Sequence, residues 1–405
     1  MPFRIALSGL NAAQADLNVT ANNVANTATT GFKGSRAEFA DLFAVSLQGV
    51  SANSSGNGVR VSNVAQQFSQ GNVEFTDSNL DLALSGQGFF ILSDSGALAY
   101  SRSGAFQVDR NGYVVNAAQQ RLQVYPPLGS GGFNTGGLSD LRLQTTDAAP
   151  QATSEVNYVL NLPANATPPP VTPFDPNDPN TFNQATSLTL FDSLGAAHTG
   201  TMYFAKTATA NTWDARLYID GTAVGPAQQL TYSNAGVLTA PVGGTLAFPN
   251  YTPTTGAADI QVDVDLSRST QFGSNFAVNS VTQDGFTTGR LIGIDIDETG
   301  IVQARFTNGR SQPLGQIAVA NFSNAQGLQQ LGNTQWAETF ASGQALRGQA
   351  GNSGFGLVQS GALEGANVDV TEQLVNMITA QRNFQANAQM ISTADQITQT
   401  IINMR

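Results

Sequence analysis

The sequence ANVDVTEQLVNMITAQRNFQANAQMISTADQITQTIINMR, residues 366–405, contains neither Gly nor Pro, although the whole chain has 41 Gly and 16 Pro. This absence predicts one long helix, because Gly and Pro destabilise helix interiors most. Asp369 and Glu372 have the spacing of a capping box, so we expect the helix to begin near Val370. Its apolar residues recur at steps of three and four, as in a coiled coil. This stripe consists of Leu374, Met377, Phe384, Ala388, Ile391 and Ile402, interrupted by Gln381 and Asp395.

The remaining surface of this predicted helix carries few charges. In residues 370–405 only Glu372, Arg382, Asp395 and Arg405 are charged. The charged face that an isolated helix in water needs is therefore missing, and we expect the helix to contact protein on most of its surface. A helix that crosses the core of its own domain is the alternative interpretation.

The opposite end of the chain has a matching pattern. No Gly or Pro falls between Leu10 and Thr30, and an apolar stripe with the same spacing has Gln14 as its polar member. The stripe consists of Phe3, Leu7, Leu10, Leu17, Ala21 and Val24. We therefore expect the two chain ends to meet as a helical pair. Because the pair has few apolar residues, we expect it to stay disordered in the monomer and to fold against copies of itself.

The bulk composition excludes several classes of protein. The chain has 405 residues, a net charge of −11 and only 11% charged residues. Nucleic-acid binding needs clustered Lys and Arg, so no nucleic-acid partner is expected. Cysteine is absent, which removes disulfides, thiolate metal ligands and Cys nucleophiles. No stretch is apolar enough to span a bilayer, so we expect no membrane insertion. The first residues also lack the basic region and apolar run of a secretory signal.

The middle of the chain has the pattern of β structure. Short apolar runs separated by Asp, Asn and Gly turns occupy residues 70–127 and 187–264. After residue 284 the sequence again has the pattern of residues 70–127. A proline cluster at residues 163–179 indicates a stiff surface crossing rather than a ligand for a proline-recognition domain. We therefore predict an α+β chain with one β domain inserted into another. The predicted parts are a terminal helical assembly domain (1–30 and 365–405), a connecting arm (31–70), a first β domain (71–139 and 285–364) and an outer β domain (140–284).

No residue pattern supports catalysis, a cofactor or a metal. Gly86 and Gly88 lack the third Gly and the helix of a dinucleotide site. Asp295 and Asp297 alternate with isoleucines as in a strand, which favours a strand and turn over a calcium loop. His198 is the single histidine, and its place after a turn predicts an exposed turn residue. We therefore predict a protein that is not an enzyme.

Two motifs at the chain ends carry a resemblance to a known family. NNVANT at residues 22–27, followed by TGFK at residues 30–33, is similar to the amino-terminal signature of bacterial flagellar rod and hook proteins. The segment LDLALSGQGFF at residues 80–90 also resembles these proteins. Residues near the other end of the chain resemble the carboxy-terminal signature of the same family. They are Asn367-Val368-Asp369, Glu372, Met377-Ile378, Gln381-Arg382, Phe384 and Asn387.

The resemblance implies a self-assembling extracellular subunit of the flagellum, exported by the flagellar type III apparatus without a cleaved signal peptide. It also implies further partners, namely the distal rod protein, a hook cap protein and a hook–filament junction protein. The long outer β domain favours a hook subunit over a distal rod subunit, which is the alternative. A secreted adhesin or glycan-binding protein is a more remote alternative. The expected assembly interface consists of Phe3, Leu7, Leu10, Leu17, Asn23, Val24, Asn26, Gly31, Phe32, Leu374, Met377, Phe384, Ile391 and Ile402.

Overall fold

The structure is a computed structural model, and it describes residues 2–42, 56–129, 131–143 and 147–403. The chain divides into two compact units. Unit 1 consists of Met1–Gln144, Gly293–Arg305 and Ser311–Arg405. Unit 2 consists of Thr145–Ile292 and Phe306–Arg310, so it is inserted into the sequence of unit 1.

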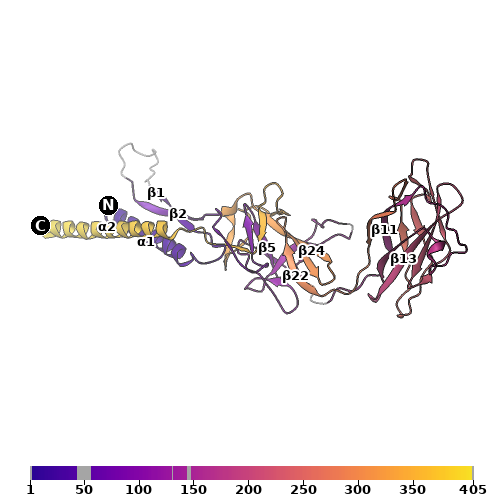
Figure 1. The fold of residues 1–405 in the computed structure, drawn as a ribbon. Helices are drawn as coiled ribbons and strands as arrows, with labels where there is room; N and C mark the ends of the chain where they lie inside the picture. Colours follow the sequence, from indigo (N-terminus) through magenta and orange to yellow (C-terminus); the bar gives the residue numbers. More distant parts are fainter. Residues whose placement is uncertain (1, 43–55, 130, 144–146, 404–405) are drawn as a thin grey trace. The chain divides into compact units, whose positions relative to one another are not determined.

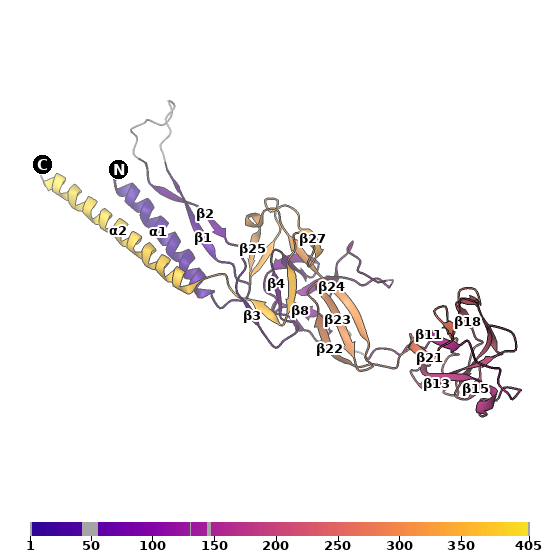
Figure 2. The same ribbon diagram turned by 45° about the horizontal axis from the view of Figure 1, so that its top comes forward.

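Two helices formed by the chain ends lie side by side in unit 1 (Figures 1 and 2). Helix α1 spans Pro2–Ala25, and helix α2 spans Val370–Asn403. The Asp369 carboxylate caps α2, because its Oδ1 accepts the N–H groups of Thr371 at 2.7 Å and Glu372 at 3.2 Å. The predicted start of the long helix is therefore confirmed.

The region expected to be a connecting arm contains a β-hairpin. Strand β1 (Ser35–Asp41) pairs antiparallel with β2 (Val59–Gln66), with a register shift between Glu38 and Phe39. Both strands pack against α1. The Ser8 hydroxyl fixes this contact, since it accepts the N–H of Val59 at 3.2 Å. The described part of this segment is therefore largely β structure.

The β domain of unit 1 is built around one large sheet, whose strand pairs are antiparallel. Its main sheet has the order β22-β23-β24-β9-β5-β6-β26-β25, and two short sheets, β28-β4 and β29-β3, complete it. The central strand β5 is buried on both faces, because Phe90 and Leu92 belong to one apolar cluster and Phe89 and Ile91 to another. The strands are β3 (Val73–Phe75), β4 (Leu82–Ser85), β5 (Phe89–Asp94), β6 (Ala97–Ser101), β7 (Gln107–Val108), β8 (Val114–Val115), β9 (Arg121–Tyr125), β10 (Ser139–Asp140), β22 (Leu291–Ile296), β23 (Ile301–Phe306), β24 (Ser311–Asn321), β25 (Gln329–Gly332), β26 (Gln335–Ala337), β27 (Leu346–Gln349), β28 (Leu357–Ser360) and β29 (Ala362–Glu364), and a 3-10 turn, η2, spans Ala325–Gly327.

Unit 2 is a β-sandwich. One sheet has the order β18-β19-β11-β20 with β21 beside β11, and the other has the order β12-β13-β14-β16-β17 with β15 beside β14. Side chains of both sheets form one core that includes Trp213, Tyr158 and Phe204. The proline-rich segment crosses the outside of the second sheet, where Phe174 and Phe182 contact Tyr203. The elements are β11 (Glu155–Pro163), η1 (Pro179–Thr181), β12 (Gln184–Phe191), β13 (Ala197–Lys206), β14 (Thr212–Ile219), β15 (Thr222–Ala223), β16 (Gln228–Tyr232), β17 (Leu238–Ala240), β18 (Thr245–Ala247), β19 (Asp263–Asp265), β20 (Thr270–Phe272) and β21 (Ala277–Gln283).

The predicted fold class is confirmed by this architecture. The protein is mostly β structure with a helix at each end of the chain, and the two helices contact each other. One β unit is inserted into the sequence of the other.

Candidate functional site

The two terminal helices run antiparallel, and two contacts fix their register. Asn23 donates from Nδ2 to Gln373 Oε1 at 3.1 Å. A Cβ added at Gly9 would lie 2.5 Å from Asn387 Oδ1, so the helices approach closely there. Gly9 thus lies opposite Asn387, and Asn23 lies opposite Gln373. The same number of residues separates the two positions on each helix, and the numbering runs in opposite directions. The helices pair within a single chain, which differs from the expectation that they fold only against other copies.

Helix α2 is covered along one line only. Its partly or fully covered side chains recur at alternating steps of four and three, as expected for a pair of helices in coiled-coil contact. They are Gln373, Met377, Ala380, Phe384, Asn387, Ile391 and Ala394, with Ala388 beside them. Only Ala380 among the described residues of α2 is fully buried. The expectation that α2 contacts protein on most of its surface is therefore not met within one chain.

The predicted interface residues fall into two groups on these helices. Met377, Phe384 and Ile391 lie on the covered line of α2, and Leu10, Leu17 and Val24 are half-buried on α1. By contrast, Phe3, Leu7, Leu374 and Ile402 are 44–67% exposed. The side chains that α1 buries are instead small or polar, namely Ala6, Ala12, Ala13, Thr20 and Asn23. Small residues allow the helix backbones to approach closely, and this leaves the large apolar residues beside the contact.

An apolar surface remains open along α2. Exposed apolar residues occur from its first to its last turn, and charged residues are scarce between them. They are Val370, Leu374, Val375, Ile378, Met390, Ile397 and Ile402. A large exposed apolar surface of this kind marks a site of association with protein or membrane. Among the described residues, neither helix is long and apolar enough to cross a membrane.

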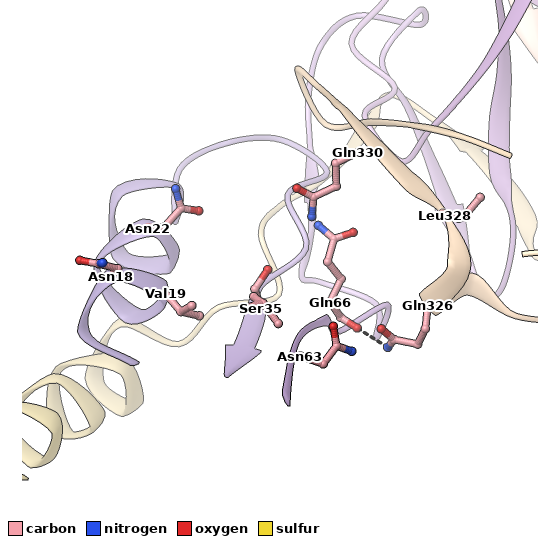
Figure 3. Close-up of a pocket in the computed structure, with 10 residues that line it drawn as sticks. Asn18, Val19, Asn22, Ser35, Asn63, Gln66, Gln326, Leu328 and Gln330 are labelled. Atoms are coloured by element: carbon pink, nitrogen blue, oxygen red, sulfur yellow. Dashed lines mark hydrogen bonds between the residues drawn. The ribbon is translucent and has the colours of Figure 1, made fainter. Parts of the chain in front are cut away.

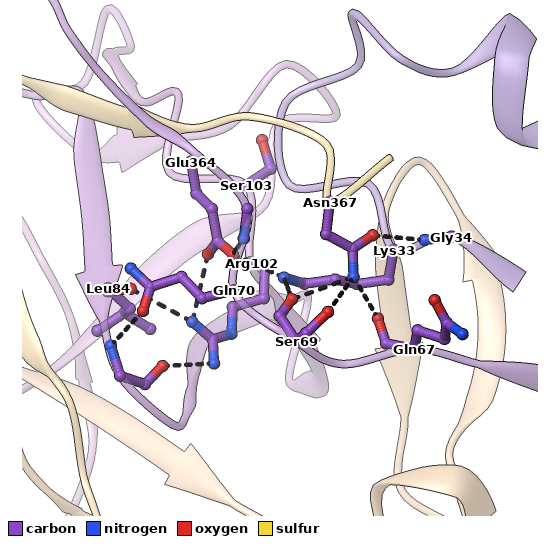
Figure 4. Close-up of polar contacts among 12 residues, drawn as sticks. Lys33, Gly34, Gln67, Ser69, Gln70, Leu84, Arg102, Ser103, Glu364 and Asn367 are labelled. Atoms are coloured by element: carbon purple, nitrogen blue, oxygen red, sulfur yellow. Dashed lines mark hydrogen bonds and ion pairs between the residues drawn. The ribbon is translucent and has the colours of Figure 1, made fainter. Parts of the chain in front are cut away.

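Asn23 and Asn367 join the two chain ends just below the helices. The Asn23 side chain makes both backbone-like hydrogen bonds to Ser35, accepting its N–H at 2.9 Å and donating to its carbonyl at 2.8 Å. Asn367 accepts the N–H of Gly34 at 2.8 Å and donates to the carbonyls of Gln67 and Ser69 (Figure 4). These amides therefore hold the segments after α1, after β2 and before α2 together.

A buried ion-pair cluster lies next to these amides. Glu364 accepts from Lys33 Nζ at 2.6 Å through Oε1 and from Arg102 Nη1 at 3.2 Å through Oε2 (Figure 4). The side chains of Lys33 and Glu364 are fully buried, and that of Arg102 is nearly so. We call Lys33, Arg102 and Glu364 the junction triad.

Backbone groups complete the coordination of the junction triad. Lys33 donates to the Ser69 carbonyl at 2.7 Å, and Arg102 donates to the Gly86 carbonyl at 2.7 Å. The Gly71 N–H donates to Glu364 Oε1 at 2.9 Å. Burial lowers the pKa of Lys33 and of Arg102, and the Glu364 carboxylate offsets only part of this effect. The triad therefore depends on its single carboxylate to keep two buried cations charged.

The remaining predicted interface residues shape the turn that leads into this junction. Gly31 is buried with φ +69°, and an added Cβ would overlap the backbone of Ser103. Its N–H donates to the Glu364 carbonyl at 2.7 Å. Asn26 closes the end of α1 by donating to the Asn22 carbonyl at 2.9 Å, and Phe32 is half-buried. Arg102 and Glu364 belong to no motif of the sequence. Their signal is the scarcity of charge, since an acid and a base in a chain with only 11% charged residues are candidates for a pair.

A polar groove of about 580 Å³ lies between α1, the β1–β2 hairpin and the segment around η2. Figure 3 shows amide side chains directed toward it from each of these elements. The Gln326 side chain closes one end by donating to the Gln66 carbonyl at 2.5 Å. The lining residues are Asn18, Val19, Asn22, Ser35, Asn63, Val64, Gln66, Gln326, Leu328 and Gln330. Neither a charge nor a nucleophile paired with a base occurs among these residues, so the groove offers contact surface rather than chemistry.

The prediction for His198 was wrong. This residue is only 6% exposed and lies between two carboxylates, Asp192 and Asp220, because its position on β13 points into the sandwich. At Asp295 and Asp297 a strand and turn had been predicted. Asp297 Oδ1 accepts the N–H groups of Thr299 and Ile301, which confirms the turn. In the part of the chain that the structure describes, no group of three His, Cys, Asp or Glu residues is placed to hold a metal.

These features define a class of protein: β-rich subunits whose two chain ends form a helical pair with an open apolar surface suited to association. Four family models match successive parts of the chain. They are described as flagella basal body rod protein (residues 3–33), flagellar hook protein FlgE/F/G D1 domain (83–167), flagellar basal body protein FlaE D2 domain (161–286) and flagellar basal body rod FlgEFG protein C-terminal (359–404).

Full-length relatives then give the particular family. The chain is 38% identical to the flagellar hook protein FlgE of Salmonella typhimurium, with 100% of both chains covered. It is 32% identical to the flagellar hook protein FlgE of Borreliella burgdorferi, with 98% of each covered. The crystal structure of Helicobacter pylori flagellar hook protein FlgE2 has a similar fold, with a TM-score of 0.55 and 14% identity over 72% of this chain and 100% of that chain. The chain belongs to the flagellar hook protein family.

Proposed function

We propose that the protein is the structural subunit that polymerises into the flagellar hook, a curved and flexible tube that joins the rod to the filament and transmits torque. The single observation that carries this proposal is the apolar, nearly uncharged surface that α2 leaves open along its length. A helix with such a surface is unfavourable in water, so neighbouring copies must cover it. The full-length similarity to flagellar hook proteins agrees with this function.

The predicted interface residues have two roles in this proposal. The exposed residues Phe3, Leu7, Leu374 and Ile402 contact neighbouring copies, whereas Met377, Phe384 and Ile391 hold α1 and α2 of one copy together. Leu10, Leu17 and Val24 support the same helical pair from α1. Asn23, Asn26, Gly31 and Phe32 shape the junction on which the pair is mounted. The helices (residues 1–30 and 365–405) thus serve as the assembly domain.

The junction triad transmits load in this proposal. Force applied to the helices must pass through the two segments that connect them to the β domain, around residues 31–34 and 364–369. Lys33 and Glu364 join the two segments, and Arg102 ties Glu364 to the β domain, through hydrogen bonds that are buried away from competing water. The hydrogen bonds of Asn367 add contacts that are part-buried or exposed. Residues 31–70 act as the arm beside the helices, and residues 140–284 form an outer domain whose contacts adjust as the tube bends.

The remaining partners follow from the same function. The subunit leaves the cell through the flagellar type III export apparatus without a cleaved signal peptide. It then joins the distal rod protein at one end of the tube and meets the hook cap protein and the hook–filament junction protein at the other. A distal rod subunit is the alternative function, and electron microscopy separates the two, because a rod subunit gives straight tubes.

An aspartate placed on the open surface of α2 tests the proposal. Leu374→Asp should prevent tube formation by the purified protein in electron micrographs, because each copy would bury an unpaired carboxylate. Val242→Asp is the matched control, since this valine is also exposed but lies in unit 2. Both variants should keep the circular dichroism of the wild-type chain. Tubes formed by Leu374→Asp as readily as by the control would contradict the proposal.

A further inference from the structure

His198 lies between two carboxylates in unit 2. Its Nδ1 is 2.6 Å from Asp220 Oδ2, and its Nε2 is 3.2 Å from Asp192 Oδ2. A carboxylate only accepts hydrogen bonds, so each ring nitrogen must carry a proton for both contacts to form. The neutral imidazole has one N–H and can satisfy only one of them. The geometry therefore requires the doubly protonated, positively charged ring.

The two carboxylates extend the contacts of His198 to three loops. Asp192 Oδ1 accepts the N–H groups of Leu194 and Ala196 and so closes the turn between β12 and β13. Asp192 Oδ2 also accepts the Thr255 hydroxyl at 2.8 Å, which adds the loop between β18 and β19. Asp220 belongs to the turn between β14 and β15, and its Oδ1 accepts the N–H of Thr199. The imidazolium is thus the common partner of two turns and one long loop.

This cluster lies next to the segments through which the chain enters and leaves unit 2. Residues 148–151 pair with residues 286–289 through isolated bridges, Ala148 with Gly289 and Gln151 with Phe286. The turn that Asp192 closes packs on both segments. A Cβ added at Gly195 in that turn would lie 2.9 Å from Pro150 and 3.3 Å from Thr287. We call this turn (residues 192–195) and the two connecting segments (148–151 and 286–289) the base of unit 2.

We propose that protonated His198 is a pH-sensitive clamp that fixes the base of unit 2, and that loss of its proton releases the turn at residues 192–195 from the connecting segments. Without the proton, neither carboxylate faces a cation, and one of the two loses its hydrogen bond from the ring. Asp192 is the one that cannot turn to solvent, because its side chain is fully buried. The inference concerns unit 2 alone and stands whether or not the proposed function is correct.

The groups around the ring favour its charged form. Burial lowers the pKa of His198, but the carboxylates of Asp220 and Asp192 more than offset this and hold the pKa above its ordinary value. Burial likewise raises the pKa of Asp192, but hydrogen bonds from Thr255, Ala196 and His198 bring it to about 2. The remaining titratable neighbour is Tyr251, whose ring faces the imidazole and whose hydroxyl is 3.5 Å from Asp220. Burial and the Asp220 charge raise the pKa of Tyr251, so it stays neutral.

The sign of the pH dependence follows from the raised pKa of His198. The stabilisation is complete below the unfolded pKa of histidine, about 6.5, and is lost as the pH rises through the folded pKa. We therefore expect unit 2 to lose stability as the pH rises above about 6.5.

Nuclear magnetic resonance on the full chain tests the charge state directly, because the chain contains a single histidine. With ¹³C and ¹⁵N in the imidazole, the titration should give a pKa above about 6.5, and the ¹⁵N shifts below it should be those of a doubly protonated ring. A pKa at or below that value, or a neutral tautomer at pH 6, would overturn the proposal.

Urea unfolding tests the consequence for unit 2. In a Trp336→Phe chain, the fluorescence of Trp213 reports on unit 2, and its unfolding midpoint should fall as the pH is raised from about 6 into the range above 6.5. His198→Gln should lower the midpoint at pH 6 and remove most of the pH dependence. A His198→Gln chain that keeps the wild-type pH dependence, or a wild-type midpoint that is constant over this range, would show a merely structural histidine and refute the clamp.

Discussion

Replacing Glu364 with Gln should destabilise unit 1 by about 3–5 kcal/mol, because breaking a buried ion pair leaves the remaining charges uncompensated. The Glu364 side chain is fully buried and is the only acid in contact with Lys33 and Arg102 among the described ion pairs. The substitution keeps the shape of the side chain but removes its charge and one acceptor oxygen. Its effect therefore measures the electrostatic role of the carboxylate.

The individual contacts give a similar magnitude. Glu364 accepts charge-assisted hydrogen bonds from Lys33 Nζ and Arg102 Nη1, and hydrogen bonds to charged groups contribute about 1.5–3 kcal/mol each. Weakening both gives about 3–6 kcal/mol, in agreement with the range for broken buried pairs. Since about 1.4 kcal/mol corresponds to a factor of ten, the unfolding equilibrium constant should rise by roughly a hundredfold to a few thousandfold.

Urea unfolding of the full chain measures this effect. In a Trp213→Phe chain, Trp336 reports on unit 1, where it is buried and donates to Gln66. Glu38→Gln is the matched control, because Glu38 pairs with Arg36 at 2.9 Å while both side chains are largely exposed. Exposed pairs contribute at most about 1 kcal/mol. If Glu364→Gln cost no more than Glu38→Gln, the junction triad would not support the chain ends as argued.

Three further changes have distinct expected results. Gly31→Ala should lower the unfolding midpoint of unit 1 by more than Gly332→Ala. Both glycines have positive φ, which costs about 1–2 kcal/mol for another residue, but of the two only Gly31 has a backbone segment against it. Equal costs would contradict this. Replacing residues 145–290, which are nearly all of unit 2 and leave the core of unit 1 intact, with a short Gly/Ser linker should give straighter tubes in electron micrographs. Loss of all polymerisation or unchanged curvature would show that the segment does not set the curvature. If the uncharged Gln/Asn face of α2 lines a channel through the tube, replacing Gln389 and Gln396 with charged residues should impair export of later substrates while tubes still form. Unaffected export would count against this role.

The sequence predicted the fold class and the start of α2 because both depend on local signals. A capping box at Asp369 and the absence of Gly and Pro decide where a helix begins and how far it continues. The contact line on α2 was harder to predict, because two neighbouring lines share Met377, Phe384 and Ile391 and both are mostly apolar. Close approach of the backbones at Gly9 selects the line with Ala380 and Asn387, and a sequence pattern does not reveal which backbones come close.

The buried polar groups were the least predictable part. Lys33 and Glu364 are separated by most of the chain, so their contact depends on the tertiary fold. His198 had a local signal that was missed. It begins an alternating series of buried residues with Met202 and Phe204 on β13, and the period of two places all three on the inner face of the sandwich.

Deleting the end of α2 is the most direct test of whether the helices at the chain ends drive assembly. The purified full chain and a chain lacking residues 393–405 should be compared by electron microscopy under identical polymerising conditions. We expect tubes from the full chain only. The truncated chain should stay monomeric, and the unfolding midpoints of both β units should be unchanged. Tubes formed by the truncated chain would contradict this expectation.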